Sequence, residues 1–166
     1  MTAYKTLYFE KPGKQNTKAL LKAVKAYAKA TGVKDMVVAS TLGETGATAA
    51  QMLKGYNVVV VTHFTGFSES GVQELKAENR ERIQKNGAKL FTGTHALSSV
   101  ERAVRKVFGT VEPLELIAST LRLMGEGTKV CVEITLMAAD AGLIPVDRDI
   151  IAIAGTGHGA DTALLI

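Results

Sequence analysis

Apolar residues follow two alternating patterns along this chain. Short runs rich in valine, isoleucine and aromatic residues favour β-strands, and they occupy Tyr4–Phe9, Asp35–Ser40, Asn57–Phe64, Lys89–Thr94 and Asp149–Ala154. Longer stretches with apolar residues three and four apart favour helices, at Thr17–Thr31, Ala47–Lys54, Val72–Asn86, Ser98–Phe108 and from about Pro113 onward. This alternation predicts βαβ units on a mostly parallel sheet.

Two segments in the last quarter of the chain do not fit this simple alternation. The run Thr128–Ala141 mixes β-branched residues with helix formers, and we predict a buried helix because the run is long and closes at Gly142. The last run, Asp161–Ile166, follows the preceding strand after a connection too short for a crossover helix. We therefore expect it to pair antiparallel at an edge, within a single α/β domain spanning 1–166.

Composition narrows the class of protein. The 166 residues are 46% hydrophobic and 22% charged, which suits a globular core without disulfides. One cysteine, Cys131, excludes a disulfide framework, and its valine neighbours predict an inert core thiol. No segment approaches the roughly 20 apolar residues of a membrane span, and no secretory signal is evident, so we expect a cytoplasmic protein. The net charge of +4 is interspersed, which indicates a solvated surface and no nucleic-acid partner.

Polar chemistry gathers in the loops that follow the predicted strands. In a parallel sheet these loops share the carboxyl edge, where ligands bind. They carry hydroxyls, glycines and all three histidines, His63, His95 and His158, whereas the loops before the strands are plain helix stops. We expect a concave polar site at this edge. The histidines lack the spacing of a zinc site, so ligand contact or stacking is the better interpretation.

The sharpest local element is the run Ser40–Thr48, between a strand and a helix. Its glycines, hydroxyls and helix N-terminus suit a phosphate, but it has neither a Walker lysine nor the full GxGxxG spacing. The alternative is simple helix capping, with Thr45 closing the first turn, and Glu44 opposes an anion unless it points outward. The residues alone leave phosphate binding and capping open.

Two other elements permit both structural and functional interpretations. The loop Gly155–Asp161 is followed by a strand, so it is either a hairpin connection or a site of close backbone approach to a ligand. Glu133, Met137 and Asp140 share one stripe if their segment is helical, which suits ligand binding or capping. No nucleophile with a paired acid and base can be identified from the sequence.

Several runs resemble a known family. The segment Val37–Ala49 resembles the strand, Ser/Thr-Gly-x-Thr loop and helix start of the C-terminal α/β domain of pyruvate kinase, where this loop holds a phosphate of a sugar-bisphosphate effector. The whole chain resembles small archaeal stand-alone proteins of that superfamily, through the runs Tyr8–Gly13, Thr65–Phe67, Lys129–Thr135, Met137–Asp140 and Gly159–Ala163. The resemblance implies a three-layer sandwich with one antiparallel edge strand.

The resemblance also implies a ligand, flavin mononucleotide (FMN). Its phosphate would lie at Thr41, Gly43, Thr45 and Gly46, and Ser40 beside them would also belong to the binding site. The rest of the ligand would contact Thr62, His63, Thr65, Gly66, Phe67, His95, Glu133, Met137, Gly155, Thr156, Gly157, Gly159 and Asp161. Kinase activity is not implied, because the catalytic barrel is absent. The alternative function is a regulatory module that senses a sugar phosphate and acts through a partner or by forming a homo-oligomer. Relatives extend past the last strand, so part of the site or of a subunit contact is expected to be missing.

Overall fold

A five-stranded sheet forms the centre of the molecule in the computed structural model, which describes residues 6–166. The strands are β1 (Asp35–Ala39), β2 (Asn57–Thr62), β3 (Lys89–Thr92), β4 (Ile151–Ala154) and β5 (Thr162–Leu165), in the order β3-β2-β1-β4-β5. The first four are parallel, with Val37 beside both Val59 and Ala152. β5 pairs antiparallel with β4, as predicted.

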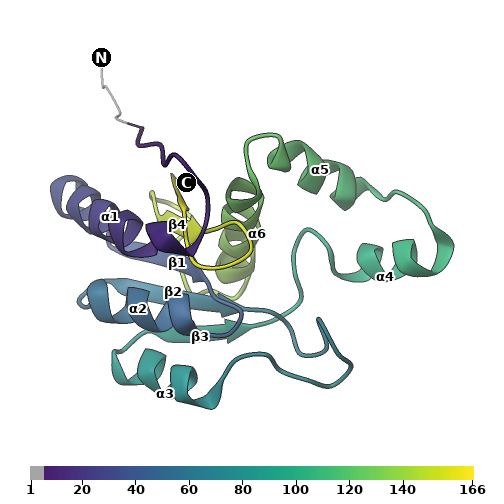
Figure 1. Ribbon diagram of the computed structural model, residues 1–166, viewed down its shortest axis with the longest axis horizontal. Coiled ribbons are helices and arrows are strands. Elements are labelled where there is room, and N and C mark those ends of the chain that lie inside the picture. The colour runs from purple at the N-terminus through teal and green to yellow at the C-terminus, as the bar shows by residue number, and fades with distance from the viewer. Residues whose placement is uncertain (1–5) are drawn as a thin grey trace.

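Helices cover both faces of the sheet and make three layers. On one face lie α1 (Thr17–Thr31), α2 (Glu44–Met52) and α3 (Ala77–Lys85), preceded by a 3-10 turn, η1 (Lys14–Asn16) (Figure 1). On the other face lies α6 (Glu126–Asp140). The remaining helices, α4 (Ser99–Phe108) and α5 (Pro113–Arg122), project from this body, and residues 99–122 are called the arm below. The α/β fold class predicted from the sequence is confirmed.

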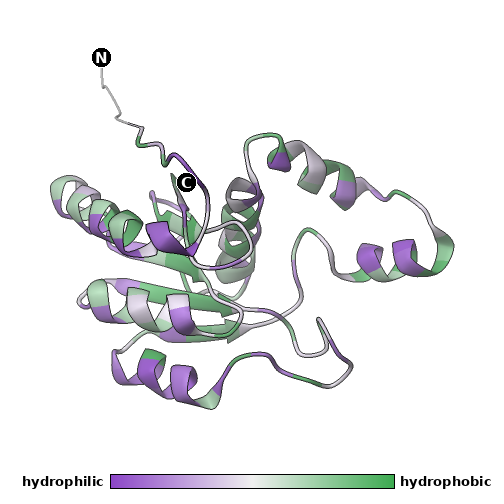
Figure 2. Cartoon of the chain, viewed as in Figure 1, coloured by the Kyte–Doolittle hydropathy of each residue, from purple (hydrophilic) through white to green (hydrophobic). Residues whose placement is uncertain are grey.

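The central strands β1, β2 and β4 are buried on both faces, which explains their apolar sequences, whereas the edge strands β3 and β5 are only partly buried. Val38, Val60 and Ile153 pack toward α1 and α2, whereas their neighbours Val37 and Val59 pack toward α6. Figure 2 shows this as a hydrophobic sheet beneath helices with polar outer faces. Burying both faces fixes the strand register, because a shift by one residue would exchange the two cores.

The predicted first strand, Tyr4–Phe9, is wrong where the structure describes it. Thr6–Phe9 have no strand partner, and Tyr8 is 90% exposed. The place beside β4 that a first strand could occupy is taken by β5, so the segment runs along the outside. Residues 4 and 5 lie outside the described part of the chain. The strands β1, β2, β3 and β5 end one or two residues before their predicted ends, whereas β4 begins two residues late and ends at Ala154 as predicted.

Helix predictions differ mainly at the boundaries. The predicted helix Val72–Asn86 begins only at Ala77, because Gln73 and Glu74 fold back toward β2. The helix predicted at Ala47–Lys54 begins at Glu44, and the ambiguous run Thr128–Ala141 is helical as predicted. None of the helices among residues 6–166 is long and apolar enough to cross a membrane.

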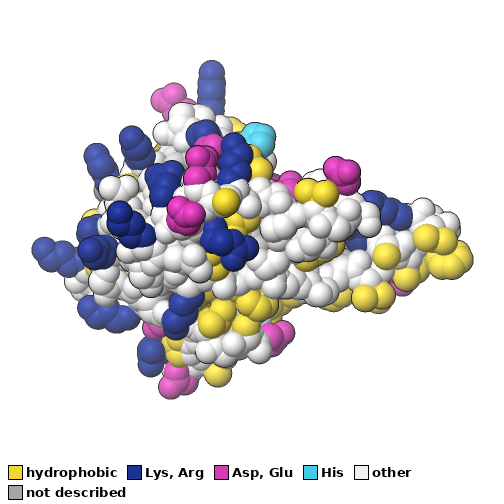
Figure 3. All heavy atoms as spheres, turned by 90° about the horizontal axis from the view of Figure 1, so that it is seen from below, with side chains coloured by type: hydrophobic (Ala, Val, Ile, Leu, Met, Phe, Trp, Pro, Cys, Tyr) yellow, Lys and Arg dark blue, Asp and Glu magenta, His cyan; other side chains and the backbone are white. Residues whose placement is uncertain are grey.

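The arm differs from the body in its burial. No residue of α4 is buried, and Val100, Val107 and Phe108 are each 73% exposed. The large apolar residues of α5 and its flanks, Val111, Leu116 and Ile117, are also exposed. Figure 3 shows hydrophobic side chains along the projecting end of the molecule. The arm therefore presents an apolar surface that the body does not cover.

Candidate functional site

A cavity of about 1060 Å³ lies at the carboxyl edge of the sheet, between the body and the arm. Its walls come from the loops that follow β1, β2, β3 and β4, and from α4, α5 and α6. All three histidines line it, at His63, His95 and His158. The predicted gathering of polar loops at one edge is therefore confirmed.

The loop between β1 and α2 presents a run of backbone donors to this cavity. Thr41, Leu42, Glu44 and Thr45 line the cavity, and no hydrogen bond within residues 6–166 uses the amides of residues 41–45 as donors. These amides include the first turn of α2, where the helix carries a positive partial charge. The arrangement suits an anion. Thr45 does not cap the helix; the Ser40 hydroxyl does, by accepting the Gly46 amide at 2.9 Å.

The two glycines of this loop serve packing. A Cβ on Gly46 would lie 2.5 Å from Val60 Cγ1, and one on Gly43 would lie 2.6 Å from Asn79 Cβ. Gly43 also has a φ of 91°, which favours glycine. Asn79 then donates to the Leu42 carbonyl at 2.9 Å. The glycines thus let α2 approach β2 and α3, which holds the loop in place, and neither lines the cavity.

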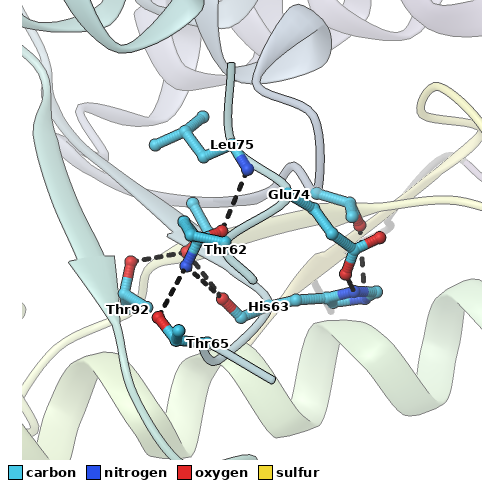
Figure 4. Close-up of polar contacts among 8 residues, drawn as sticks. Thr62, His63, Thr65, Glu74, Leu75 and Thr92 are labelled. Carbon is cyan, nitrogen blue, oxygen red and sulfur yellow. Dashed lines mark hydrogen bonds and ion pairs between the residues drawn. The ribbon is translucent and has the colours of Figure 1, made fainter. Parts of the chain in front are cut away.

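His63, at the end of β2, is held on every side (Figure 4). Its Nδ1 lies 2.8 Å from Glu74 Oε2, and its Nε2 lies 3.2 Å from Thr41 Oγ1. Its carbonyl accepts from the Thr62 hydroxyl and from Gln73 Nε2, and Thr62 also pairs with the Thr92 hydroxyl at 2.6 Å. The loop after β2 therefore fixes both the ring and the backbone of His63.

Aromatic rings cluster beside His63. The centroids of the Phe67 and His63 rings lie 3.9 Å apart, and the Arg102 guanidinium lies 4.2 Å from the Phe67 centroid. The His95 ring lies 5.0 Å from the Phe64 ring and 5.3 Å from the rings of His63 and Phe67, measured between centroids. These tilted and edge-on rings, with a guanidinium beside them, offer aromatic faces and edges that suit a planar ligand group.

His95 is an unpartnered polar side chain in the cavity wall. It is 8% exposed, and its ring nitrogens make no hydrogen bond within residues 6–166. Burial lowers the pKa of His95 from 6.5 to about 4, although the Glu133 carboxylate opposes the shift. The ring is therefore neutral at physiological pH, with one donor and one acceptor nitrogen.

Opposite the histidines, α6 contributes a buried ion pair. Lys129 Nζ lies 2.5 Å from Glu133 Oε2, and both side chains are about 95% buried. The other oxygen, Oε1, accepts the Leu97 amide at 3.0 Å, which ties the β3–α4 loop to α6. Glu133 and Met137 line the cavity, but the third residue of the predicted stripe, Asp140, does not.

The glycine-rich loop after β4 is tied to the beginning of the chain. Asp161 accepts the amides of Gly13 at 2.7 Å and of Thr156 at 3.2 Å, so it organises backbone and does not line the cavity. Gly159 packs against Lys14, whose Cα would lie 2.4 Å from an added Cβ. Only Gly157 has open space around it. Close approach here is mostly between protein segments.

The structure brings most of the predicted residues together. Those that line the cavity are Ser40, Thr41, Thr45, Thr62, His63, Phe67, His95, Glu133, Met137, Gly155, Gly157 and Gly159. Those that do not are Gly43, Gly46, Thr65, Gly66, Thr156 and Asp161. Thr65 and Gly66 instead line a second cavity of about 640 Å³, which shares Phe67 and Arg102 with the first.

Sequence reasoning missed the charged side chains around the cavity. They are Lys14, Arg102, Arg105, Glu115, Arg122, Glu126 and Lys129. Most pair with one another, as in Arg105–Glu115 at 2.9 Å and Arg122–Glu126 at 2.8 Å. They come from helices, where charged residues are common on solvated faces, so only the fold distinguishes them.

Two further predictions concern single residue types. Cys131 is buried and donates to the Ala152 carbonyl at 3.4 Å, and burial raises the pKa of its thiol to about 12. It is an inert core thiol, as predicted. Among residues 6–166, no group of three or more His, Cys, Asp or Glu side chains is arranged to hold a metal ion.

Comparison with known proteins identifies the family. Three crystal structures of Cryptosporidium parvum pyruvate kinase, one in complex with ADP, match with 12–13% sequence identity and TM-scores of 0.43–0.45. The matched region covers 90% of this chain but only 22–23% of each pyruvate kinase chain. This chain therefore spans less than a quarter of the length of those proteins. The family model of the pyruvate kinase alpha/beta domain matches residues 18–166. This chain therefore belongs to the pyruvate kinase alpha/beta domain family.

Proposed function

We propose that this protein binds a phosphate-bearing small molecule, with FMN as the first candidate, in the cavity at the carboxyl edge of the sheet. The phosphate lies against the backbone amides of residues 41–45. The observation that carries the proposal is that these amides donate to no acceptor within residues 6–166, although four of the five residues, Thr41, Leu42, Glu44 and Thr45, border a cavity. Buried or partly buried amides normally have a partner.

The remaining residues fit FMN as a group. The cavity is at the upper end of the size range of small-molecule sites, roughly 300–1,000 Å³. Phe67, His63 and His95 offer ring faces and edges for a planar heterocycle. When bound, a flavin would supply electron-transfer chemistry of its own. The chain's residues would bind and orient it.

One acidic and one basic side chain, Glu44 and Lys14, lie near the proposed phosphate position. Glu44 stands in the first turn of α2, and its carboxylate forms an ion pair with Lys14 Nζ at 2.6 Å. The hydrogen bond from Lys14 lowers the pKa of Glu44, so this carboxylate is ionised. Lys14 offsets it at the cavity rim. We expect the phosphate to lie on the Thr41–Thr45 side and the ion pair to remain at the entrance.

The proposal also covers the origin of the protein, its location in the cell and its oligomeric state. We expect the chain to be related to archaeal stand-alone proteins of the family, to work in the cytoplasm, and to form a homo-oligomer. The sequence runs that resemble those proteins support the first of these expectations, and the exposed apolar residues of the arm support the third.

A second candidate function is a regulatory module that senses a sugar phosphate. The arm favours it, because Arg102, Arg105 and Arg122 line the cavity while Val107 and Phe108 on the same arm are exposed. A ligand that contacts these arginines would touch the element that a partner could also contact. Such coupling between a site and a surface is what regulation requires.

Calorimetry with FMN and with a sugar phosphate separates these functions. FMN binding, and a protein that carries a flavin absorption band at about 450 nm, supports the first; binding of the sugar phosphate alone supports the second. Thr45→Glu should abolish binding of either ligand and leave the fold intact, because a carboxylate would occupy the phosphate position. Thr110→Glu, an exposed change on the arm, is the matched control. Unchanged affinity in Thr45→Glu would contradict the placement of the phosphate.

A further inference from the structure

A hydroxyl, an imidazole and a carboxylate are joined in series, with the hydroxyl and the imidazole in the cavity wall and the carboxylate behind them. Thr41 Oγ1 is 3.2 Å from His63 Nε2, and His63 Nδ1 is 2.8 Å from Glu74 Oε2 (Figure 4). This is the order of a nucleophile, a general base and the group that orients the base. We propose that Thr41, His63 and Glu74 form a catalytic relay that cleaves phosphate monoesters. The inference rests on the proposed function, because it needs the phosphate at residues 41–45.

Glu74 sets the direction of the relay. A carboxylate that faces Nδ1 accepts the proton carried there, which leaves the Nε2 lone pair toward the Thr41 hydroxyl. The contact between His63 and Glu74 is partly shielded from solvent, with side-chain exposures of 29% for His63 and 21% for Glu74. Contact with Phe67 and the bond from Gln73 to the His63 carbonyl fix the ring further. Glu74 is therefore a positioning residue, and His63 is the base.

The donors that a phosphoryl reaction needs start at the nucleophile itself. The run of unused amides begins with Thr41, so the same residue offers a hydroxyl and an N–H. Amides aimed at the phosphoryl oxygens stabilise the charge that develops during transfer. His95 lines the same cavity, and its ring nitrogens make no hydrogen bond within residues 6–166, so they are available to a bound ester.

The chemistry has two balanced steps. In the first, Thr41 Oγ1 bonds to phosphorus while the bond from phosphorus to the ester oxygen breaks. His63 takes the hydroxyl proton and gives it to the departing alcohol. In the second, water attacks phosphorus, its proton passes through His63 to Thr41 Oγ1, and the Thr41–phosphorus bond breaks. Ester and water become alcohol and inorganic phosphate, without an oxidant, a reductant or a metal.

The test uses p-nitrophenyl phosphate, whose cleavage releases a coloured product, and FMN, whose cleavage gives riboflavin. Thr41→Val removes the hydroxyl at nearly constant shape, and we expect turnover of p-nitrophenyl phosphate to fall at least about a hundredfold. Thr41→Ser keeps the hydroxyl and should retain turnover within about tenfold. The control, Thr31→Val, lies at the exposed far end of α1 and should match the wild type.

Binding of inorganic phosphate, measured by calorimetry, keeps the outcomes distinct. Thr41→Val should bind it within about threefold of the wild type, because amides hold the phosphate. Glu74→Gln should lower kcat at least about tenfold with KM unchanged, as a positioning role requires. Turnover in Thr41→Val equal to the wild type, or a wild type that binds phosphate and cleaves neither ester, overturns the relay and leaves the proposed function standing. A wild type that binds neither phosphate nor FMN overturns both.

Discussion

The body and the arm have similar fractions of apolar residues, but they bury these residues to different extents. In the body, Val37, Val59 and Ile153 are completely enclosed by helices on two sides of the sheet. In the arm, α4 has a pronounced apolar face, yet Val100, Val107 and Phe108 remain exposed. The free energy of folding therefore comes from the body, while the arm contributes side chains to the cavity. The following predictions test that division.

The largest effect should come from truncation in the body. Ile153 is fully buried in β4, so Ile153→Ala removes well-packed atoms and leaves a cavity. We expect a loss of about 2–5 kcal/mol in the free energy of unfolding, measured by urea denaturation. A loss below about 1 kcal/mol would show that the sheet centre is less well packed than the structure indicates.

The next effect concerns His95, at the junction of body and arm. Its pKa is about 4 in the folded protein and 6.5 without burial, so the unfolded chain takes up the proton first as pH falls. Stability should be complete above about pH 6.5 and decline toward pH 4, by at most about 3 kcal/mol. His95→Gln should flatten this decline, whereas His158→Gln, at an exposed position, should not. The decline is measured from the midpoints of urea denaturation between about pH 7.5 and 4. An equal decline in the wild type and in His95→Gln would show that His95 is not its cause.

A smaller effect is expected where α2 approaches the sheet. Gly46→Ala places a Cβ 2.5 Å from Val60 Cγ1 and should destabilise the body by about 1–3 kcal/mol. Val60→Ala in the same chain should recover part of that loss, because the smaller residue makes room. A double-mutant cycle by chemical denaturation reveals the coupling. Additive losses would mean that the two residues do not interfere.

The smallest effect should come from the arm. Phe108→Ala removes a large aromatic side chain, but one that is 73% exposed, so the free energy of unfolding should change by less than about 0.5 kcal/mol. Chemical denaturation of dilute protein gives the value. A loss as large as that of Ile153→Ala would mean that the arm is covered in solution, and a concentration-dependent midpoint would identify another copy of the chain as the cover.

The sequence predicted the fold well where one pattern had one physical meaning. Valine runs such as Asn57–Thr62 are explained only by a doubly covered strand, and the short connection before β5 permits only antiparallel pairing. The first predicted strand failed because alternation in Tyr4–Phe9 says nothing about whether an edge is free. The long α3 prediction failed because polar side chains at Gln73 and Glu74 prefer contacts with His63 to helix.

The position of the candidate site could be predicted from the sequence, but the side chains that contact its residues could not. Strand order puts Thr41, His63 and His95 at one edge, and this follows from topology. The partner of His63 is Glu74, which comes from a loop taken for helix. The cavity residue Glu133 pairs with Lys129, which lies on a helix whose buried face was unknown. Such contacts depend on side-chain reach across the fold, which periodicity does not encode.

The bonds of Asp161 to Gly13 and of the Ala160 amide to Thr17 join residues 148 and 143 positions apart. During synthesis the first helix leaves the ribosome long before its partners exist. Contacts so distant in sequence form slowly, because a long loop must close before they stabilise anything. A nascent chain can assemble much of the sheet early, but it cannot complete the wall of the cavity until the final loop has emerged, so partially synthesised chains have no competent site.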